Sequence, residues 1–275
     1  MNTLDFVCVG PQRTGTSWLD KLLRYHPELC LPKNVKETMF FDRDYEKGIE
    51  YYWDYFSDRQ SNQRCGEIGP TYFDSSIIPN RIQAINPNCK IIINLRNPIS
   101  RALSSYHHHL GKGRVKGTFT DAIAQIPRII DAGRYQLHTT RWLETFGADQ
   151  VSFLLLEDIE FEPERVLSQL YEFLDVSTIE MPDLGKKRIG EATSPKYPLL
   201  AKVAAQSATW LRSNRLHHVA ELGKALGVTK VYRGGERSLP DLTIDERYQL
   251  IEHYESDIAF LEKLLGRDLS PWRQA

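Results

Sequence analysis

The chain has 275 residues, of which 41% are hydrophobic and 26% charged, a composition that excludes a disordered protein. The length allows one domain with a full core or at most two small domains, and since no linker is evident we expect a single domain over residues 1–275. Its formal net charge of -1 lacks the basic excess of proteins that bind long nucleic acids, so we expect no nucleic-acid partner. No stretch approaches the roughly 20 apolar residues of a membrane span, and no signal peptide precedes the first apolar run. A cytoplasmic protein is therefore expected.

The number and spacing of the cysteines also favour a cytoplasmic protein. The four cysteines are widely spaced and form no C-x-x-C pair, which argues against a zinc site and against a disulfide framework. Cys8 and Cys89 lie in or beside apolar runs, so we expect buried free thiols, as in a reducing compartment.

Apolar strand candidates alternate along the chain with amphipathic helix candidates. In chain order we expect strands at 5–9, 64–68, 90–95 and 151–156. Helices are expected at 17–25, 76–85, 98–110, 134–146, 162–174 and 243–265. A glycine loop follows the first strand, and segment 39–56 is expected to form a turn and then a helix that packs its aromatic side chains inward. This order predicts a single P-loop-like α/β domain with a central parallel sheet flanked by helices and a helical C-terminal part.

The glycine loop GPQRTGTS at 10–17 connects the first strand to the first helix. It matches the phosphate-loop spacing G-x-x-x-x-G-K-[ST] except at Thr16, which stands in place of lysine. Backbone N–H groups from Arg13 to Ser17 would favour an anion, and Arg13 can supply the missing positive charge. The alternative is a turn that only packs strand on helix. The missing lysine, with no obvious Walker-B carboxylate, disfavours a metal-dependent nucleotide triphosphatase.

A second basic element follows the strand at 90–95. Arg96 stands at the carboxyl end of this strand, where parallel sheets bind ligands, and Ser104 lies eight residues further along, in the helix that Pro98 opens. Together they could hold a second phosphate. Taken alone, an arginine at a strand end is more often part of a surface ion pair.

Together these segments resemble the sulfotransferases that use 3′-phosphoadenosine-5′-phosphosulfate (PAPS), in particular the heparan sulfate branch and its bacterial relatives. GPQRTGTSWL resembles the 5′-phosphosulfate loop of that family, and LRNPISRALSSY resembles its 3′-phosphate motif. Glu37-Thr-Met-Phe-Phe41 fits an E-x-x-F-F segment, and GEIGPTYFDS and LLGRDLSPW resemble two further segments.

The resemblance implies transfer of a sulfuryl group from PAPS, with 3′-phosphoadenosine-5′-phosphate (PAP) as product and no metal. It implies that Arg96 and Ser104 bind the 3′-phosphate and that Glu37 is the general base. The residues implied to hold the 5′-phosphosulfate are Arg13, Thr14, Gly15, Thr16 and Ser17. Arg13 would also stabilise the departing bisphosphate. Without the resemblance, Glu37 would be interpreted as a solvated loop carboxylate beside Lys33 and Lys36.

Two departures from the family pattern concern the acceptor and catalysis. The heparan sulfate enzymes carry lysine where this chain has Arg13, and a substrate-handling lysine where it has Ile68. The second departure argues against a heparan-like acceptor. A sugar, a lipid headgroup, a small natural product and a peptide tyrosine remain open, with a carbohydrate or small molecule favoured.

Two clusters leave alternatives open. Consecutive helical residues point in different directions, so His107, His108 and His109 are not expected to bind one metal ion, although one of them could face the acceptor. The basic cluster from Lys186 to Arg188 is either a solvated patch or a contact with nucleotide or acceptor. Most aromatic rings between 51 and 56 are expected in the core, with one or two available to an acceptor pocket.

Two rival functions remain. A P-loop kinase would bind ATP with magnesium, and the missing loop lysine counts against it. A non-catalytic module would bind a sulfated or phosphorylated ligand without transfer. The presence of Arg13, Glu37, Arg96 and Ser104 together counts against that.

Overall fold

Five parallel strands form the centre of the molecule. The computed structural model describes residues 3–186, 203–204, 206–207, 210–211 and 239–274. The strands are β1 (Phe6–Gly10), β2 (Leu29–Cys30), β3 (Arg64–Ile68), β4 (Lys90–Leu95) and β5 (Val151–Leu155), in the sheet order β2-β3-β1-β4-β5. Four of them were predicted within a residue of these bounds. The sequence did not predict β2, because two residues carry no periodic signal.

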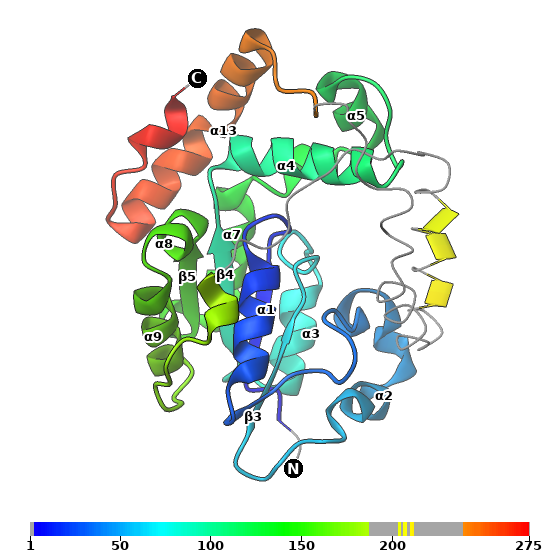
Figure 1. Cartoon of the computed structure of the whole chain (residues 1–275), viewed down its shortest axis with the longest axis vertical. Helices are drawn as coiled ribbons and strands as arrows, with labels where there is room; N and C mark the ends of the chain where they lie inside the picture. The colour runs from blue at the N-terminus through cyan, green and yellow to red at the C-terminus, as the bar shows by residue number, and fades with distance from the viewer. Residues whose placement is uncertain (1–2, 187–202, 205, 208–209, 212–238, 275) are drawn as a thin grey trace.

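Helices cover both faces of the sheet (Figure 1). The predicted ones are α1 (Thr16–Tyr25), α3 (Ile78–Ile85), α4 (Pro98–Gly111), α7 (Tyr135–Phe146), α9 (Pro163–Phe173) and α13 (Ile244–Leu265). The unpredicted ones are short: α5 (Phe119–Gln125), α6 (Arg128–Asp131) and α8 (Leu156–Phe161). The predicted α/β architecture with a central parallel sheet flanked by helices is thus confirmed.

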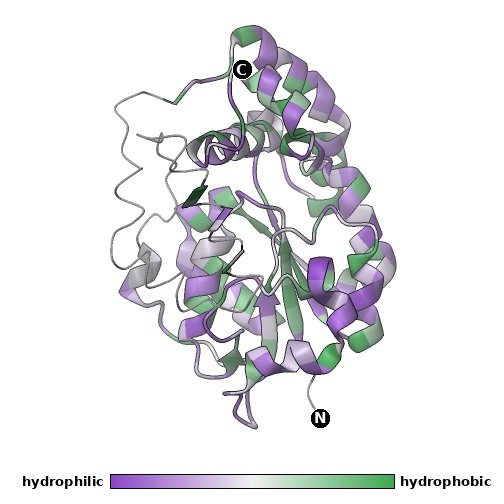
Figure 2. Cartoon of the chain, turned by 90° about the vertical axis from the view of Figure 1, so that its right-hand side faces the viewer, coloured by the Kyte–Doolittle hydropathy of each residue, from purple (hydrophilic) through white to green (hydrophobic). Residues whose placement is uncertain are grey.

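Strand residues alternate between two apolar clusters, one on each face of the sheet. Phe6, Cys8 and Ile92 pack against α1 and α9, whereas Val7, Val9 and Ile91 pack against the side that carries α3, α4, α7 and α13. Figure 2 shows the strands as the hydrophobic centre of the molecule. All four cysteines are buried and free, and Cys30 stands opposite Cys65 in the β2–β3 register.

The aromatic segment 39–56 differs from the predicted turn and single helix. It forms a π-helical turn η1 (Phe40–Asp44), a 3-10 turn η2 (Tyr45–Lys47), a short helix α2 (Ile49–Trp53) and a second 3-10 turn η3 (Asp54–Phe56). Gly48 divides the segment, because its φ of 82° and ψ of 162° are not helical. Most of the aromatic rings are buried as predicted: Phe40, Phe41, Tyr52, Tyr55 and Phe56.

The chain packs closely where β1 ends. Gly69 N–H donates to Cys8 O and Phe73 N–H to Val9 O, so the segment after β3 lies against the last residues of β1. Gly10 has a φ of 95°, and a Cβ placed on it would stand 2.7 Å from the Cα and O atoms of Pro70. Within the described residues, no helix has the length and apolarity needed to cross a membrane.

We predict that Gly10→Ala destabilises the fold more than a substitution at another positive-φ glycine. The added methyl group combines a left-handed backbone, which costs about 1–2 kcal/mol, with overpacking against Pro70, which costs about 1–3 kcal/mol. Gly266→Ala is the control, since Gly266 has a φ of 59° with nothing within 4 Å of its Cβ position. Urea unfolding of both variants measures the difference, and equal losses would contradict the close approach of Pro70.

Candidate active site

The glycine loop leads into α1 with its backbone shaped for an anion. Arg13 and Gly15 both have positive φ angles, 74° and 90°. The first bond inside α1 runs from Trp18 N–H to Gly15 O, so the N–H groups before Trp18 remain at the open end of the helix, where they favour negative charge. Thr14 is fully buried and donates from Oγ1 to Pro11 O at 2.6 Å, so its side chain shapes the loop.

A lysine from another segment supplies the positive charge that the loop lacks, because Thr16 stands where the phosphate-loop pattern has lysine. Lys36 Nζ lies 3.1 Å from Thr16 Oγ1 and 3.2 Å from Ser17 Oγ. Lys36 belongs to the turn that follows β2, so the charge comes from a neighbouring strand connection and not from the loop. The sequence showed Lys36 only as a neighbour of Glu37, because no local spacing places its ammonium group at α1.

The two predicted phosphate motifs meet directly. Arg13 Nε donates to Ser104 Oγ at 3.0 Å, and Arg96 Nη1 donates to Arg13 O at 3.2 Å. Burial, and then the charge of Arg96, lowers the pKa of Arg13. A bound anion would relieve the repulsion between these two guanidinium groups. The structure therefore brings Arg13, Arg96 and Ser104 into one cationic site.

The end of β4 is held in place from α7 and α8. Tyr135 in α7 donates its hydroxyl proton to Arg96 O at 2.7 Å, and the Asn97 N–H donates to Glu157 Oε1 at 3.0 Å. Burial lowers the pKa of Arg96, while the charge of Glu157 opposes that change. The backbone at the end of β4 is thus held by two hydrogen bonds, and the guanidinium group donates to Arg13 O in the glycine loop, which weakens the surface ion-pair interpretation.

Glu37 lies beside the open end of α1. Its Oε1 is 3.8 Å from Lys36 Nζ, and its side chain keeps 26% of its surface exposed. Arg128 in α6 is ion-paired with Asp74. Burial lowers the pKa of Arg128, but the hydrogen bond and charge of Asp74 and the charges of Asp42 and Glu37 raise it by more, so the net shift is upward. Lys36 is thus the cation beside Glu37, and a substrate can still reach the exposed part of the Glu37 side chain.

The three histidines of α4 do not act together. His107 Nε2 pairs with Pro240 O at 2.8 Å. Burial, reinforced by neighbouring cations, lowers the pKa of His108 to about 2 and of His109 to about 4. Both rings are therefore neutral near pH 7. In the part of the chain that the structure describes, no group of three or more metal-ligating side chains is arranged for a metal ion.

The structure also places Ile68 and the first residue of the basic cluster 186–188. Ile68 is fully buried in the cluster that packs against α1 and α9, so its side chain fills the core. Its neighbour Glu67 points to the opposite face, towards Thr38 and Tyr72. Of the basic cluster, Lys186 ends the turn η5 (Asp183–Lys186), and Lys187 and Arg188 lie outside the described residues.

Comparisons with known proteins agree with this geometry. The family described as "Sulfotransferase domain" matches residues 4–195. The bifunctional heparan sulfate N-deacetylase/N-sulfotransferase 1 of Caenorhabditis elegans is 30% identical over an alignment of 227 residues that covers 70% of this chain and 26% of that protein. Its counterpart in Mus musculus is 28% identical over 96% of this chain and 30% of that protein. The chain thus spans less than a third of these relatives.

A solved structure gives the same fold. The sulfotransferase from Alicyclobacillus acidocaldarius superposes with a TM-score of 0.73 at 24% sequence identity, covering 100% of both chains. At this identity the likeness concerns the fold.

We predict that Lys36→Met weakens PAP binding about 10- to 100-fold, because a charge-assisted hydrogen bond to a bound anion is worth about 1.5–3 kcal/mol. Lys33→Met is the matched control, since Lys33 lies in the same turn but pairs with Asp58 at the surface. Calorimetric titration with PAP measures both. Unchanged affinity in Lys36→Met would contradict the role of this ammonium group at α1.

Proposed function

The chain belongs to the sulfotransferase family, and on that premise we propose that it transfers a sulfuryl group from PAPS to a hydroxyl or amine of an acceptor. One observation carries the proposal: the ammonium group of Lys36 contacts the hydroxyl groups of Thr16 and Ser17 and approaches Glu37. The ammonium group of Lys36 therefore lies between the start of α1 and the carboxylate of Glu37, the proposed base.

In the proposed reaction Glu37 takes the proton from the acceptor as the acceptor attacks sulfur. The bond between sulfur and the bridging phosphate oxygen then breaks, and PAP leaves with the extra negative charge. Lys36, Arg13 and the N–H groups at the start of α1 lie where that charge develops. Such donors typically contribute about 10²–10³-fold each, and a general base about 10²–10⁴-fold.

The 3′-phosphate is assigned to Arg96 and Ser104. Ser104 Oγ accepts from Arg13 Nε, so its own proton is available for a phosphate oxygen. Arg13 then connects the two phosphate positions: it orients Ser104 and adds positive charge next to the 5′ side. Thr14, Gly15, Thr16 and Ser17 complete the proposed 5′ site through the loop and the first turn of α1.

For the acceptor we propose a carbohydrate or small molecule with negative charge. Burial and the charges of Arg114, Lys112 and Arg128 lower the pKa of His109, which marks a positive potential on this side of the site. Ile68, where the heparan sulfate enzymes carry lysine, argues against a heparan-like acceptor, whereas the curated relatives are named for N-deacetylation and N-sulfation of heparan sulfate. An N-deacetylated heparan oligosaccharide is therefore the first acceptor to test, and other anionic carbohydrates are the next. A cytoplasmic location stays a prediction.

We predict tight, metal-independent binding of PAP that Arg96→Ala weakens at least about tenfold, because a charged contact to the 3′-phosphate is lost. The control is Arg165→Ala, which removes an exposed arginine paired with Glu162. Calorimetry with PAP, and with ATP plus magnesium in parallel, decides between the functions. Preference for ATP with magnesium would favour the kinase alternative, and PAP binding without transfer to any acceptor would favour the binding module.

We predict that Glu37→Gln lowers the transfer rate about 10²–10⁴-fold and leaves PAP affinity nearly unchanged, because the amide cannot accept the acceptor's proton. Glu46→Gln, an exposed glutamate in η2, is the control. Transfer of radiolabelled sulfate from PAPS measures the rate. A Glu37→Gln protein with full activity would remove Glu37 from the mechanism.

A further inference from the structure

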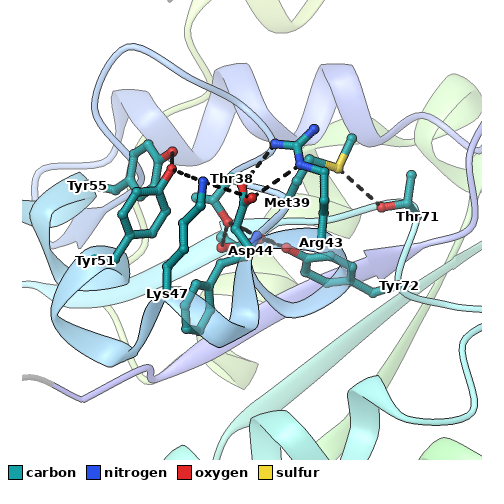
Figure 3. Close-up of polar contacts among 11 residues, drawn as sticks. Thr38, Met39, Arg43, Asp44, Lys47, Tyr51, Tyr55, Thr71 and Tyr72 are labelled. Carbon is teal, nitrogen blue, oxygen red and sulfur yellow. Dashed lines mark hydrogen bonds and ion pairs between the residues drawn. The ribbon is translucent and has the colours of Figure 1, made fainter. Parts of the chain in front are cut away.

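A fully buried carboxyl group lies directly behind the proposed base. Glu67 in β3 has 0% of its surface exposed. Thr38 Oγ1 donates to its Oε2 at 2.8 Å, and the Tyr72 hydroxyl donates to its Oε1 at 2.5 Å. Each oxygen therefore has one hydroxyl donor, which is the pattern that suits an ionised carboxylate. Thr38 and Tyr72 lie close together in Figure 3.

The hydroxyl group of Thr38 connects this carboxylate to the turn that carries the base. Thr38 follows Glu37 directly and is 2% exposed. Its Oγ1 accepts the N–H of Phe40 at 3.1 Å while donating to Glu67. The next residue, Met39, has a φ of 58°, and its sulfur accepts the Thr71 hydroxyl at 3.8 Å (Figure 3). The Thr38 hydroxyl group therefore links the turn 37–40 to β3, while the buried rings of Phe40 and Phe41 pack the end of the turn against Tyr52 and Tyr72.

In the described part of the chain, the titratable groups found to interact with Glu67 are acidic or neutral. They are Glu37 from the turn after β2, Tyr52 from α2, Tyr72 from the segment after β3 and Cys89 before β4. Among the described residues, no lysine or arginine forms an ion pair with it. Burial raises the pKa of Glu67 to about 7, the hydrogen bonds from Tyr72 and Thr38 oppose the rise, and the charge of Glu37 adds to it.

We propose that Glu67 is a positioning residue for the transfer reaction: its ionised carboxylate holds Thr38, and through Thr38 it holds the Glu37 carboxylate beside Lys36 and the start of α1. This inference rests on the proposed role of Glu37. When Glu67 takes up a proton, one of its oxygens becomes a donor, so one of the two hydroxyl groups loses its acceptor. The turn is then less firmly held, and the base moves out of line with the loop.

The transfer rate should depend on the protonation of Glu67. Glu67 is ionised above about pH 7 and protonated below it, so the wild-type kcat should fall as the pH decreases through about 7. Glu67→Gln has no such transition and should show a low kcat that is flat through this range. KM for PAPS and the affinity for PAP should stay unchanged, because the loop and Arg96 are not altered.

Stability should change in the opposite direction to the rate. The folded pKa of Glu67 lies above its ordinary value of 4.5, so its contribution to stability is present below about 4.5 and is lost as the pH rises through about 7. Glu67→Gln removes this loss and should melt at a higher temperature than wild type at mildly alkaline pH. A merely structural hydrogen-bonding role would instead lower melting temperature and rate together.

The decisive experiment compares Thr38→Val, Thr38→Ser, Glu67→Gln and wild type with an N-deacetylated heparan oligosaccharide as acceptor. We expect Thr38→Val to lower kcat about 10- to 100-fold through misplacement of the base, and Thr38→Ser to restore most of it. Thr145→Val is the control, since it removes a half-buried hydroxyl that donates to Arg141 O in α7. Wild-type kcat in Thr38→Val, or parallel losses of stability and rate in Glu67→Gln, would overturn the proposal.

Failure of the proposed function would look different. In that case wild type would bind no PAP or transfer no sulfuryl group, or Glu37→Gln would keep full activity. The melting temperatures of wild type and Glu67→Gln across the neutral range, together with a protonated-carboxyl infrared band that only wild type shows, report the titration of Glu67 without any transfer assay. Absence of that band and of the pH-dependent difference in melting temperature would exclude Glu67 as the titrating group.

Discussion

The anion-binding end of α1 is the constraint on which the site depends. Unpaired N–H groups at a helix start attract negative charge, but the loop before α1 lacks the lysine that usually completes such a site. Lys36 supplies this charge from the turn after β2, and Glu37 is the next residue along the chain. Because Glu37 follows Lys36 directly, the contact of Lys36 with the start of α1 also places the proposed base there.

The strand β3 contributes to the site through its alternation. Ile68 points into the core between the sheet and α1, whereas Glu67 points to the opposite face, where hydroxyl groups of Thr38 and Tyr72 bind it. Burying a carboxyl group without a cation lowers stability at alkaline pH. A loss of stability of this kind is expected where function requires a fixed polar group. Here the buried carboxyl group accepts a hydrogen bond from Thr38, the residue that follows the proposed base.

Several positive groups lie close together between the loop, the end of β4 and α4. Arg13 and Arg96 are neighbours, and Lys112 lies near His108, whose pKa it lowers. Their mutual repulsion opposes folding in the absence of ligand and favours binding of an anionic donor, which compensates these charges. The rings of His108 and His109 belong to the same region, where burial and then the neighbouring cations lower their pKa values, so they add no positive charge there near pH 7.

The α/β class, four of the five strands, the main helices and the family motifs are predictable from the sequence, because these depend on local periodicity and short spacings. The sequence also predicts the site residues Arg13, Arg96 and Ser104, which the structure brings together. It could not show that Lys36 reaches Thr16, that segment 39–56 divides at Gly48, or that Glu67 and Ile68 face opposite sides. Those features depend on the order of strands in the sheet and on which turns end beside each other, and only the tertiary structure decides them.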